Sequence, residues 1–193
     1  GAVALLPLAA RAQAWPAKPI RWVVPYTAGG FTDVSTRLTL EKINLGQPFV
    51  VDNKPGANSL IGAEAVAKSA SDGYTFLTVI AAHAANKTLY AGKLSFDPET
   101  SFAPVSLAGI APLILTSSNA FPAKTVKELI DYARANPGKV NYASSAAPFQ
   151  MASELFNQRT GTAFAHIPYK GSGDSVNAVI AGQVTITISD PPP

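Results

Sequence analysis

The stretch "VVPYTAGGFTDVSTRL" at residues 23–38 sets the expectation for the fold. A β-branched apolar run ends in a double glycine, and the residues that follow place Val34 and Leu38 on one helical face. Gly29 and Gly30 allow a sharp turn and a close approach to a ligand, and the free N–H groups of the helix start favour an anion. The stretch therefore predicts a strand, a glycine turn and a helix, with a candidate binding site at the turn.

Three interpretations of this turn compete: a nucleotide loop, a plain strand–helix connection, and a pocket for a small acid. The turn lacks both the G-x-G-x-x-G spacing and the Walker Gly-Lys-Ser/Thr, which argues against a nucleotide. Asp33 could receive a ligand ammonium or hydroxyl, although residue preference alone favours a helix cap. The residues of the turn leave the plain connection and the acid pocket open.

Strand-like and helix-like segments alternate on both sides of this stretch. The expected strands are residues 20–26, 49–53, 74–80, 140–144, 164–169 and 184–189, and the expected helices are residues 32–45, 60–70, 125–135, 151–160 and 174–181. Two further extended runs, 105–110 and 113–118, have no helix between them and suggest a passage between two domains. Single helices between strands predict βαβ units with parallel sheets, hence an α/β fold.

Composition restricts the function. The chain has 193 residues, 47% of them hydrophobic, and a net charge of +3 without a Lys/Arg cluster, which fits compact α/β domains and argues against a nucleic-acid partner. It contains no cysteine, so disulfides and thiolate sites are excluded.

The two ends of the sequence carry further expectations. The segment "GAVALLPLAARAQA" predicts a signal-peptide remnant over residues 1–14, with a short core helix as the alternative. The final "SDPPP" suggests a truncated chain.

The candidate ligand groups follow the predicted strands, because ligands of parallel sheets collect outside the carboxyl ends of the strands. These positions are residues 26–33, 81–86, 144–150 and 169–173, and Asp190. Lys170 could offer a point charge to a carboxylate or remain a solvated surface residue. His83 follows a strand, so it could line the pocket.

Catalytic sets are sparse. His83 and His166 are the only histidines and have no metal-ligand spacing, so we expect no metal and no cofactor. His166 alternates with apolar residues and is expected on a sheet face or in the core. Ser144 and Ser145 lack a G-x-S-x-G elbow and a placed acid–base partner. An enzyme, a hydrolase or a transferase, remains the alternative function.

Several segments, in order, carry a family resemblance: "KPIRWVVPYTAGGFTD", "PFVVDNKPGANSLIGAEAVAKSASDGYTFL", "FAPVSLAG", "PGKVNYAS" and "HIPYKGSG". Together they resemble the Bug or TctC-type extracytoplasmic solute receptors of tripartite tricarboxylate transporters. The resemblance extends over almost all of residues 15–190. It is specific because separate motifs agree in order.

The resemblance implies a two-lobed periplasmic binding protein of type II with parallel-rich sheets, its C-terminal part missing. The lobes would be residues 15–103 and 104–193, with a hinge near 101–104. Such a receptor is a monomer that binds a small carboxylate between the lobes and delivers it to membrane permease subunits. The resemblance implies ligand contacts from Tyr26, Thr27, Ala28, Gly29, Gly30, Asp33, His83, Asn86, Ser144, Ser145, Tyr169, Lys170, Gly171, Ser172, Gly173 and Asp190. A sensory ligand-binding domain would be a third class.

The sequence departs from the family pattern at three places. Thr27 and Lys87 each stand where the family often has proline. The loop after "NYAS" is shortened to "SAAPFQ", which removes hydroxyl donors and adds Phe149. This loop would suit a more apolar or aromatic acid, or weaken binding.

Overall fold

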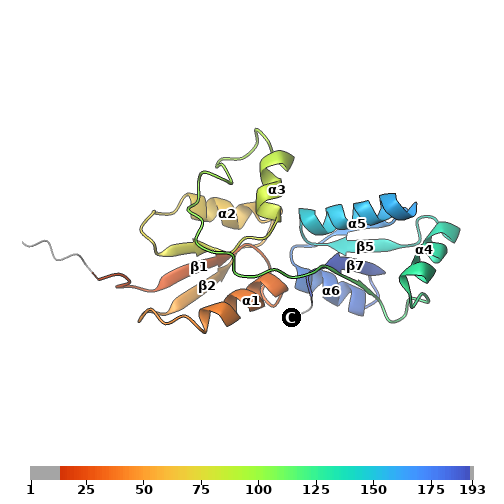
Figure 1. The fold of residues 1–193 in the computed structure, drawn as a ribbon, viewed down its shortest axis with the longest axis horizontal. Helices are drawn as coiled ribbons and strands as arrows, with labels where there is room; N and C mark the ends of the chain where they lie inside the picture. Colours follow the sequence, from red (N-terminus) through yellow and green to blue (C-terminus); the bar gives the residue numbers. More distant parts are fainter. Residues whose placement is uncertain (1–13, 192–193) are drawn as a thin grey trace, which may run out of the picture.

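The computed structural model describes residues 14–191, arranged as two sheet units side by side along the long axis of the molecule (Figure 1). We call residues 20–89 the first sheet unit and residues 114–189 the second sheet unit. The proposed signal-peptide remnant lies outside the described residues except for its last position. The division into lobes at residues 103 and 104 stays a prediction.

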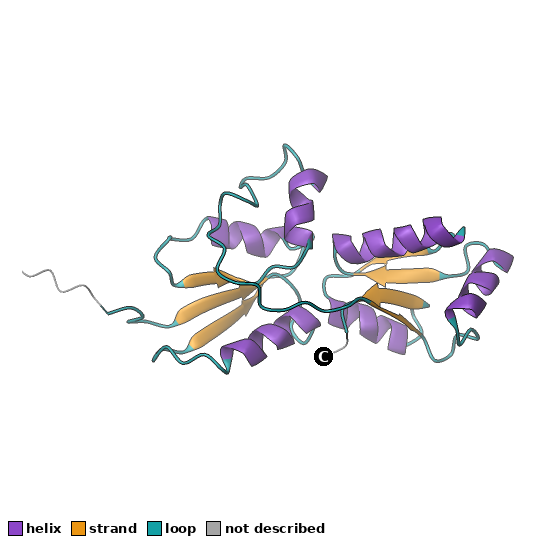
Figure 2. Cartoon of the chain, in the orientation of Figure 1, coloured by secondary structure: helices purple, strands orange, loops and turns teal. Residues whose placement is uncertain are grey.

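The first sheet unit holds three parallel strands in the order β2-β1-β3, with Trp22 opposite Val51 and Phe76. Its helices α1 and α2 lie on opposite faces of the sheet (Figure 2). The elements are β1 (Ile20–Val24), α1 (Phe31–Leu40), β2 (Phe49–Asn53), α2 (Leu60–Ala67), β3 (Thr75–Leu77) and α3 (Ala82–Leu89).

The second sheet unit holds four strands in the order β4-β7-β5-β6, parallel except where β4 pairs with β7. Its helices α5 and α6 cover opposite faces of the sheet (Figure 2). The elements are β4 (Ile114–Ser117), α4 (Val126–Ala135), β5 (Asn141–Ser144), α5 (Ala147–Thr160), β6 (Ala165–Pro168), α6 (Ser172–Ile180) and β7 (Ile186–Ser189).

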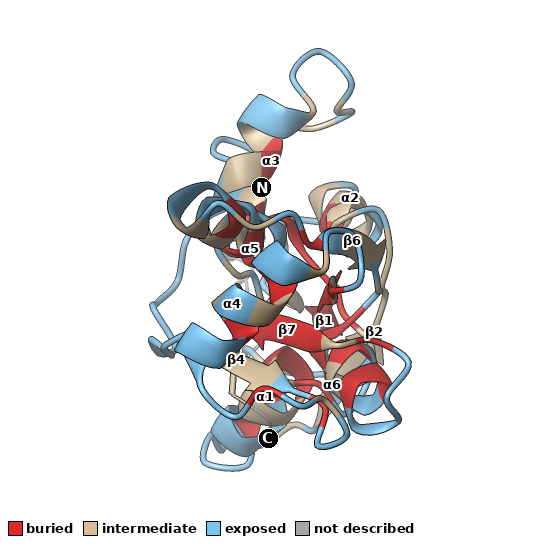
Figure 3. Ribbon diagram, turned by 90° about the vertical axis from the view of Figure 1, so that its right-hand side faces the viewer, coloured by how far each residue is buried: buried red, intermediate tan, exposed pale blue. Residues whose placement is uncertain are grey.

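Helices on both faces of the second sheet explain the burial of its central strands, β5 and above all β7. All four residues of β7 are buried, as expected for a strand that is covered on both sides. Tyr142 and Ile186 are completely buried and pack with Leu129 of α4 in the main core cluster. Buried residues concentrate on the strands in Figure 3, while the outer helix faces are exposed. The sheets are therefore rigid supports for the loops at their ends.

Thr125 is the N-cap of α4 and caps it through its side chain. The Thr125 hydroxyl accepts a hydrogen bond from the Glu128 N–H at 3.2 Å. The Glu128 carboxylate accepts one from the Lys124 N–H at 2.7 Å. The first bond satisfies an N–H group that the first helical turn leaves free, and the second fixes the residue before the cap.

The larger differences from the expected elements are the following. Helix α1 ends at Leu40 rather than at residue 45, and residues 82–89 form helix α3, which was not among the expected helices. Helix α5 begins at Ala147, because a proline in the first turn loses no helical hydrogen bond. Residues 105–110 form no strand: Val105 and Ile110 are 77% and 90% exposed, and the run has no partner strand among the described residues.

Within residues 14–191, no helix combines the length and the apolar character needed to cross a lipid bilayer.

Candidate functional site

Apart from the antiparallel β4, the strands of each sheet unit point their carboxyl ends toward the other unit, so the loops that follow them meet between the units (Figures 1 and 2). We call this region the strand-end junction. It comprises residues 26–31, 58–59, 145–147 and 171–173, and Asp190. The amino ends of α1, α5 and α6 all begin here. Helix amino ends carry partial positive charge and free N–H groups, so this arrangement favours an anion.

Two hydrogen bonds cross the strand-end junction. The Phe31 N–H donates to the Ser172 hydroxyl at 3.3 Å, and the Ala147 N–H donates to the Asn58 side-chain oxygen at 2.8 Å. Gly30 lies so close to Gly173 that a Cβ added at Gly30 would meet the Gly173 nitrogen at 3.3 Å. The absence of side chains thus lets two helix starts from different sheet units approach each other.

An apolar cluster also spans the strand-end junction. Val24, Tyr26 and Ala82 of the first sheet unit pack with Ala146 and Phe149 of the second. Phe149 is 5% exposed and lies in the first turn of α5 rather than in a loop. It therefore contributes to the contact between the units, which is a different role from the loop position expected from the sequence.

Asp33 holds the glycine turn in shape. Its carboxylate accepts hydrogen bonds from the Gly29 N–H at 2.9 Å, the Asn53 amide at 2.9 Å and Arg37 Nε at 3.0 Å. Burial alone would raise the pKa of Asp33, but hydrogen bonds from Arg37, Gly29 and Asn53 hold this pKa below its ordinary value. The N-cap of α1 is Gly30, without a side-chain cap, so the favoured cap interpretation of Asp33 is wrong. Asp33 instead fixes the backbone before the helix.

Asp33→Ala should lower the free energy of unfolding by about 2–3 kcal/mol, because it removes a buried, charged acceptor of three hydrogen bonds. Asp52→Ala is the matched control: its ion pair with Arg21 is about one-third exposed and should contribute less than about 1 kcal/mol.

Because the pKa of Asp33 is lowered on folding, the stabilisation that Asp33 provides should be present above its unfolded pKa and disappear as the pH falls through the folded pKa. Urea unfolding at several pH values measures this, and equal losses in the two variants would contradict it.

Four buried side-chain atoms have no hydrogen-bond partner among the described residues: the Tyr26 hydroxyl, the Thr27 hydroxyl, the Ser145 hydroxyl and Asp190 Oδ1. All four lie at the strand-end junction, and they come from both sheet units. Buried polar groups are normally satisfied, and each unsatisfied one costs about 1–3 kcal/mol. Their concentration at one place indicates a site whose hydrogen bonds are completed by something the chain itself does not supply.

Burial dominates the electrostatics of the strand-end junction. It raises the pKa of Asp190 to about 6, against partial opposition from the Ser172 hydroxyl. Burial likewise raises the pKa of Tyr26, and the negative charge of Asp190 adds to that effect. Lys170 is exposed and forms no ion pair within residues 14–191. No contact among these residues therefore supports its proposed role as a point charge for a ligand. Positive potential at the junction therefore comes from backbone N–H groups.

The remaining predicted residues lie around this centre. Ala28 and Gly29 are exposed at its edge, whereas Tyr169 packs against a separate apolar cluster that includes Ala178 and Val179 of α6. His83 Nε2 lies 2.9 Å from the Pro98 carbonyl oxygen, and its ring packs on Phe102. The ring of His83 is thus engaged by the segment after α3.

Asn86 and Asn58 form a supporting pair behind the strand-end junction. Asn86 is completely buried; its amide donates to the Asn58 carbonyl oxygen at 2.9 Å, and its oxygen accepts from the Asn58 amide at 2.6 Å. Asn58 in turn accepts from the Ala147 N–H of the other sheet unit. Asn86 therefore acts on the junction through Asn58.

Asn58 and Ser59 were not identified from the sequence. Ala57, Asn58 and Ser59 all have positive φ, at 47°, 53° and 73°, which is uncommon for residues other than glycine and concentrates at functional sites. A signal was present, because this loop follows β2 and so obeys the same strand-end rule as the other candidates.

Ser144 and His166 form a pair that the sequence did not place. Ser144 Oγ lies 2.7 Å from His166 Nε2, and the His166 ring stacks on Tyr142 with centroids 5.0 Å apart. Burial lowers the pKa of His166. Tyr142 also donates to Glu154 of α5, so the face that these residues share lies beneath that helix. No carboxylate bonds His166 within the described residues, so a hydrolytic triad is incomplete.

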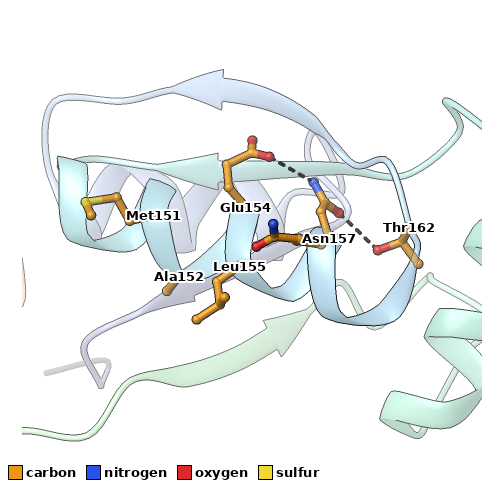
Figure 4. A pocket seen from close by; sticks show the side chains of 7 residues that line it. Met151, Ala152, Glu154, Leu155, Asn157 and Thr162 are labelled. Carbon is orange, nitrogen blue, oxygen red and sulfur yellow. Dashed lines mark hydrogen bonds between the residues drawn. The ribbon is translucent and has the colours of Figure 1, made fainter.

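A hollow with a volume of about 760 Å³ lies elsewhere, along α5 (Figure 4). Three of its polar side chains are paired: Asn157 bonds Glu154 at 3.4 Å and Thr162 at 3.0 Å. Met151 and Leu155, both more than half exposed, form its apolar part. An open hollow without unpaired buried groups is a weaker candidate than the strand-end junction. No group of metal-binding side chains occurs within residues 14–191.

Comparison with known proteins gives concordant results. A family model described as "Tripartite tricarboxylate transporter family receptor" matches residues 36–193. The chain is 38% identical over 191 residues to Protein BugT of Bordetella pertussis, covering 94% of this chain and 57% of BugT. Two solved structures are similar. The first is an R. palustris protein with adipate, with a TM-score of 0.86 and 36% identity, covering 92% of this chain and 60% of that one. The second is MatC from Rhodopseudomonas palustris with bound malate, with a TM-score of 0.81 and 28% identity, covering 91% of this chain and 61% of that one. The chain thus spans less than two thirds of the length of each.

Proposed function

The chain belongs to the tripartite tricarboxylate transporter receptor family, and we propose that it is an extracytoplasmic receptor that binds a small organic acid at the strand-end junction. Its α/β fold with parallel-rich sheets is that of the periplasmic binding proteins it matches. The family and the structural neighbours are solute-binding receptors rather than enzymes.

The observation that carries this proposal is the set of four unpartnered polar atoms among the helix starts. Three hydroxyl groups supply donors for a carboxylate, and the N–H groups at the starts of α1, α5 and α6 supply partial positive charge. Micromolar affinity requires about −8 kcal/mol, and charge-assisted hydrogen bonds contribute about 1.5–3 kcal/mol each. A few such bonds plus burial reach this value after the ordering costs of binding.

The ligand enters when the two sheet units separate. In the present arrangement Phe31 and Ser172, and likewise Ala147 and Asn58, contact each other directly. Residues 103–113, which connect the units without helix or strand, allow such a motion, with the hinge near 101–104. Capture is then a reversible closure, and no covalent step is needed.

In this proposal the protein works in the periplasm as a monomer and passes its ligand to membrane permease subunits. The adipate and malate of the two structural neighbours make open-chain carboxylates the first ligands to examine.

Titration calorimetry of the full-length protein against mono-, di- and aromatic carboxylates tests the proposal. We expect at least one acid to bind with a micromolar Kd and its neutral amide not to bind, because the amide lacks the charge that the helix starts favour. Ser145→Ala should weaken binding about 10-fold through loss of one hydrogen bond to a charged group, whereas exposed Ser71→Ala should not change it. Absence of binding across the whole panel would refute the proposed function.

A further inference from the structure

Asp190 occupies an unusual position for a carboxylate. It directly follows β7, whose residues are all buried, and is itself only 6% exposed. Its Oδ1 atom has no hydrogen-bond partner among the described residues, and no cationic side chain pairs with it there. A buried carboxylate without a cation or a full set of donors is costly to maintain.

The other buried carboxylate near the strand-end junction provides the comparison. Asp33, 2% exposed, receives hydrogen bonds from a backbone N–H, an amide and a guanidinium. The chain therefore satisfies Asp33 completely and leaves an oxygen of Asp190 open. A structural role explains Asp33, but it does not explain Asp190.

The surroundings of Asp190 connect it to the proposed anion site. Ser172, whose hydroxyl accepts from the Phe31 N–H at the start of α1, also lies beside Asp190 and lowers the pKa of its carboxyl group. The Tyr26 hydroxyl, which lacks a partner, is close enough to be influenced by the charge of Asp190. The open oxygen and the amides of a helix start thus lie on either side of one serine hydroxyl.

We propose that the ligand carries a hydrogen-bond donor, a hydroxyl or an ammonium, beside its carboxylate, and that this donor binds Asp190 Oδ1. The inference rests on the proposed function and narrows its substrate class to 2-hydroxy and 2-amino acids. A second carboxylate of the ligand at this point would place two like charges together in a poorly solvated site, which is unfavourable. A hydroxyl or ammonium completes the coordination of the oxygen and adds attraction.

Matched acids test the proposal in the full-length protein at pH 8, where Asp190 is ionised. The pairs are succinate against malate and aspartate, and butanoate against 2-hydroxybutanoate. At least one donor-bearing acid should bind about 10- to 100-fold more tightly than its plain counterpart, as expected for one charge-assisted hydrogen bond. Equal affinities in every pair, or tighter binding of the plain acids, would overturn the proposal. This result needs only the unmodified protein.

Asp190→Asn locates the effect. The amide keeps the shape but not the charge, so the preference for the donor-bearing acid should fall to within about 3-fold. Asp174→Asn, an exposed position in α6, is the matched control and should keep the preference. A preference that survives Asp190→Asn overturns the assignment to this residue. Binding of carboxylates without preference refutes only this inference, whereas the absence of any carboxylate binding refutes the proposed function as well.

Discussion

Gly171→Ala should weaken ligand binding by about 5- to 150-fold, which corresponds to the 1–3 kcal/mol that overpacking typically costs. A Cβ at this position would lie 1.9 Å from Thr27 Oγ1, 3.0 Å from Thr27 Cβ and 3.2 Å from the Thr27 nitrogen. Rotation of the threonine side chain removes the first clash but not the other two. The two sheet units would therefore have to stay farther apart.

The substitution should affect closure rather than folding of the second sheet unit. Gly171 has extended backbone, φ −158° and ψ 157°, which alanine adopts freely. Gly109→Ala is the matched control, because a Cβ there meets nothing within 4 Å. Calorimetry gives the affinities, and X-ray scattering with saturating ligand reports whether the variant remains more open. Unchanged affinity in Gly171→Ala would show that the observed contact is not part of the bound state.

Sequence patterns gave reliable information where the local chemistry is decisive. The limits of β2 match the expected 49–53, because its β-branched core is bounded by turn residues. Helix α4, Val126–Ala135, matches the expected 125–135 to within one residue, because Thr125 caps its start. The strand-end rule brought Tyr26, Ser145 and Asp190 into one list, and the structure leaves all three with unpartnered atoms at one junction.

Other features depend on contacts between distant segments, which a single sequence does not encode locally. Helix α3 lacks a capping side chain, and its buried positions Ala82 and Asn86 are fixed by packing and by Asn58. The partner of Ser144 depends on the register of β5 and β6, which pairs Tyr142 with His166. Whether a buried carboxylate is satisfied is also a tertiary property, so the contrast between Asp33 and Asp190 needs the structure.

Asp190→Asn should stabilise the unliganded protein at pH 8 by up to about 3 kcal/mol. Folding raises the pKa of Asp190 from its ordinary value of 3.8 to about 6, and each unit of difference corresponds to about 1.4 kcal/mol. Because the folded pKa is the higher one, the contribution of Asp190 to stability is fully present below pH 3.8 and is lost as the pH rises through 6. The asparagine variant has no such loss.

Urea unfolding of both proteins between pH 4 and pH 8, without ligand, measures this difference. The variant's advantage should grow with pH and level off above pH 7, while Asp174→Asn should run parallel to the unmodified protein. Tyr26, the titratable group facing Asp190, has a raised pKa and stays neutral in this range, and Asp33 is common to both proteins and cancels. A pH-independent difference would mean that Asp190 is not held ionised at a cost. If the difference follows this course, the buried charge of Asp190 destabilises the unliganded receptor. A hydrogen-bond donor of the ligand would pair with this same charge. The free energy of binding such a ligand would then include the free energy that the unpaired charge costs the empty receptor.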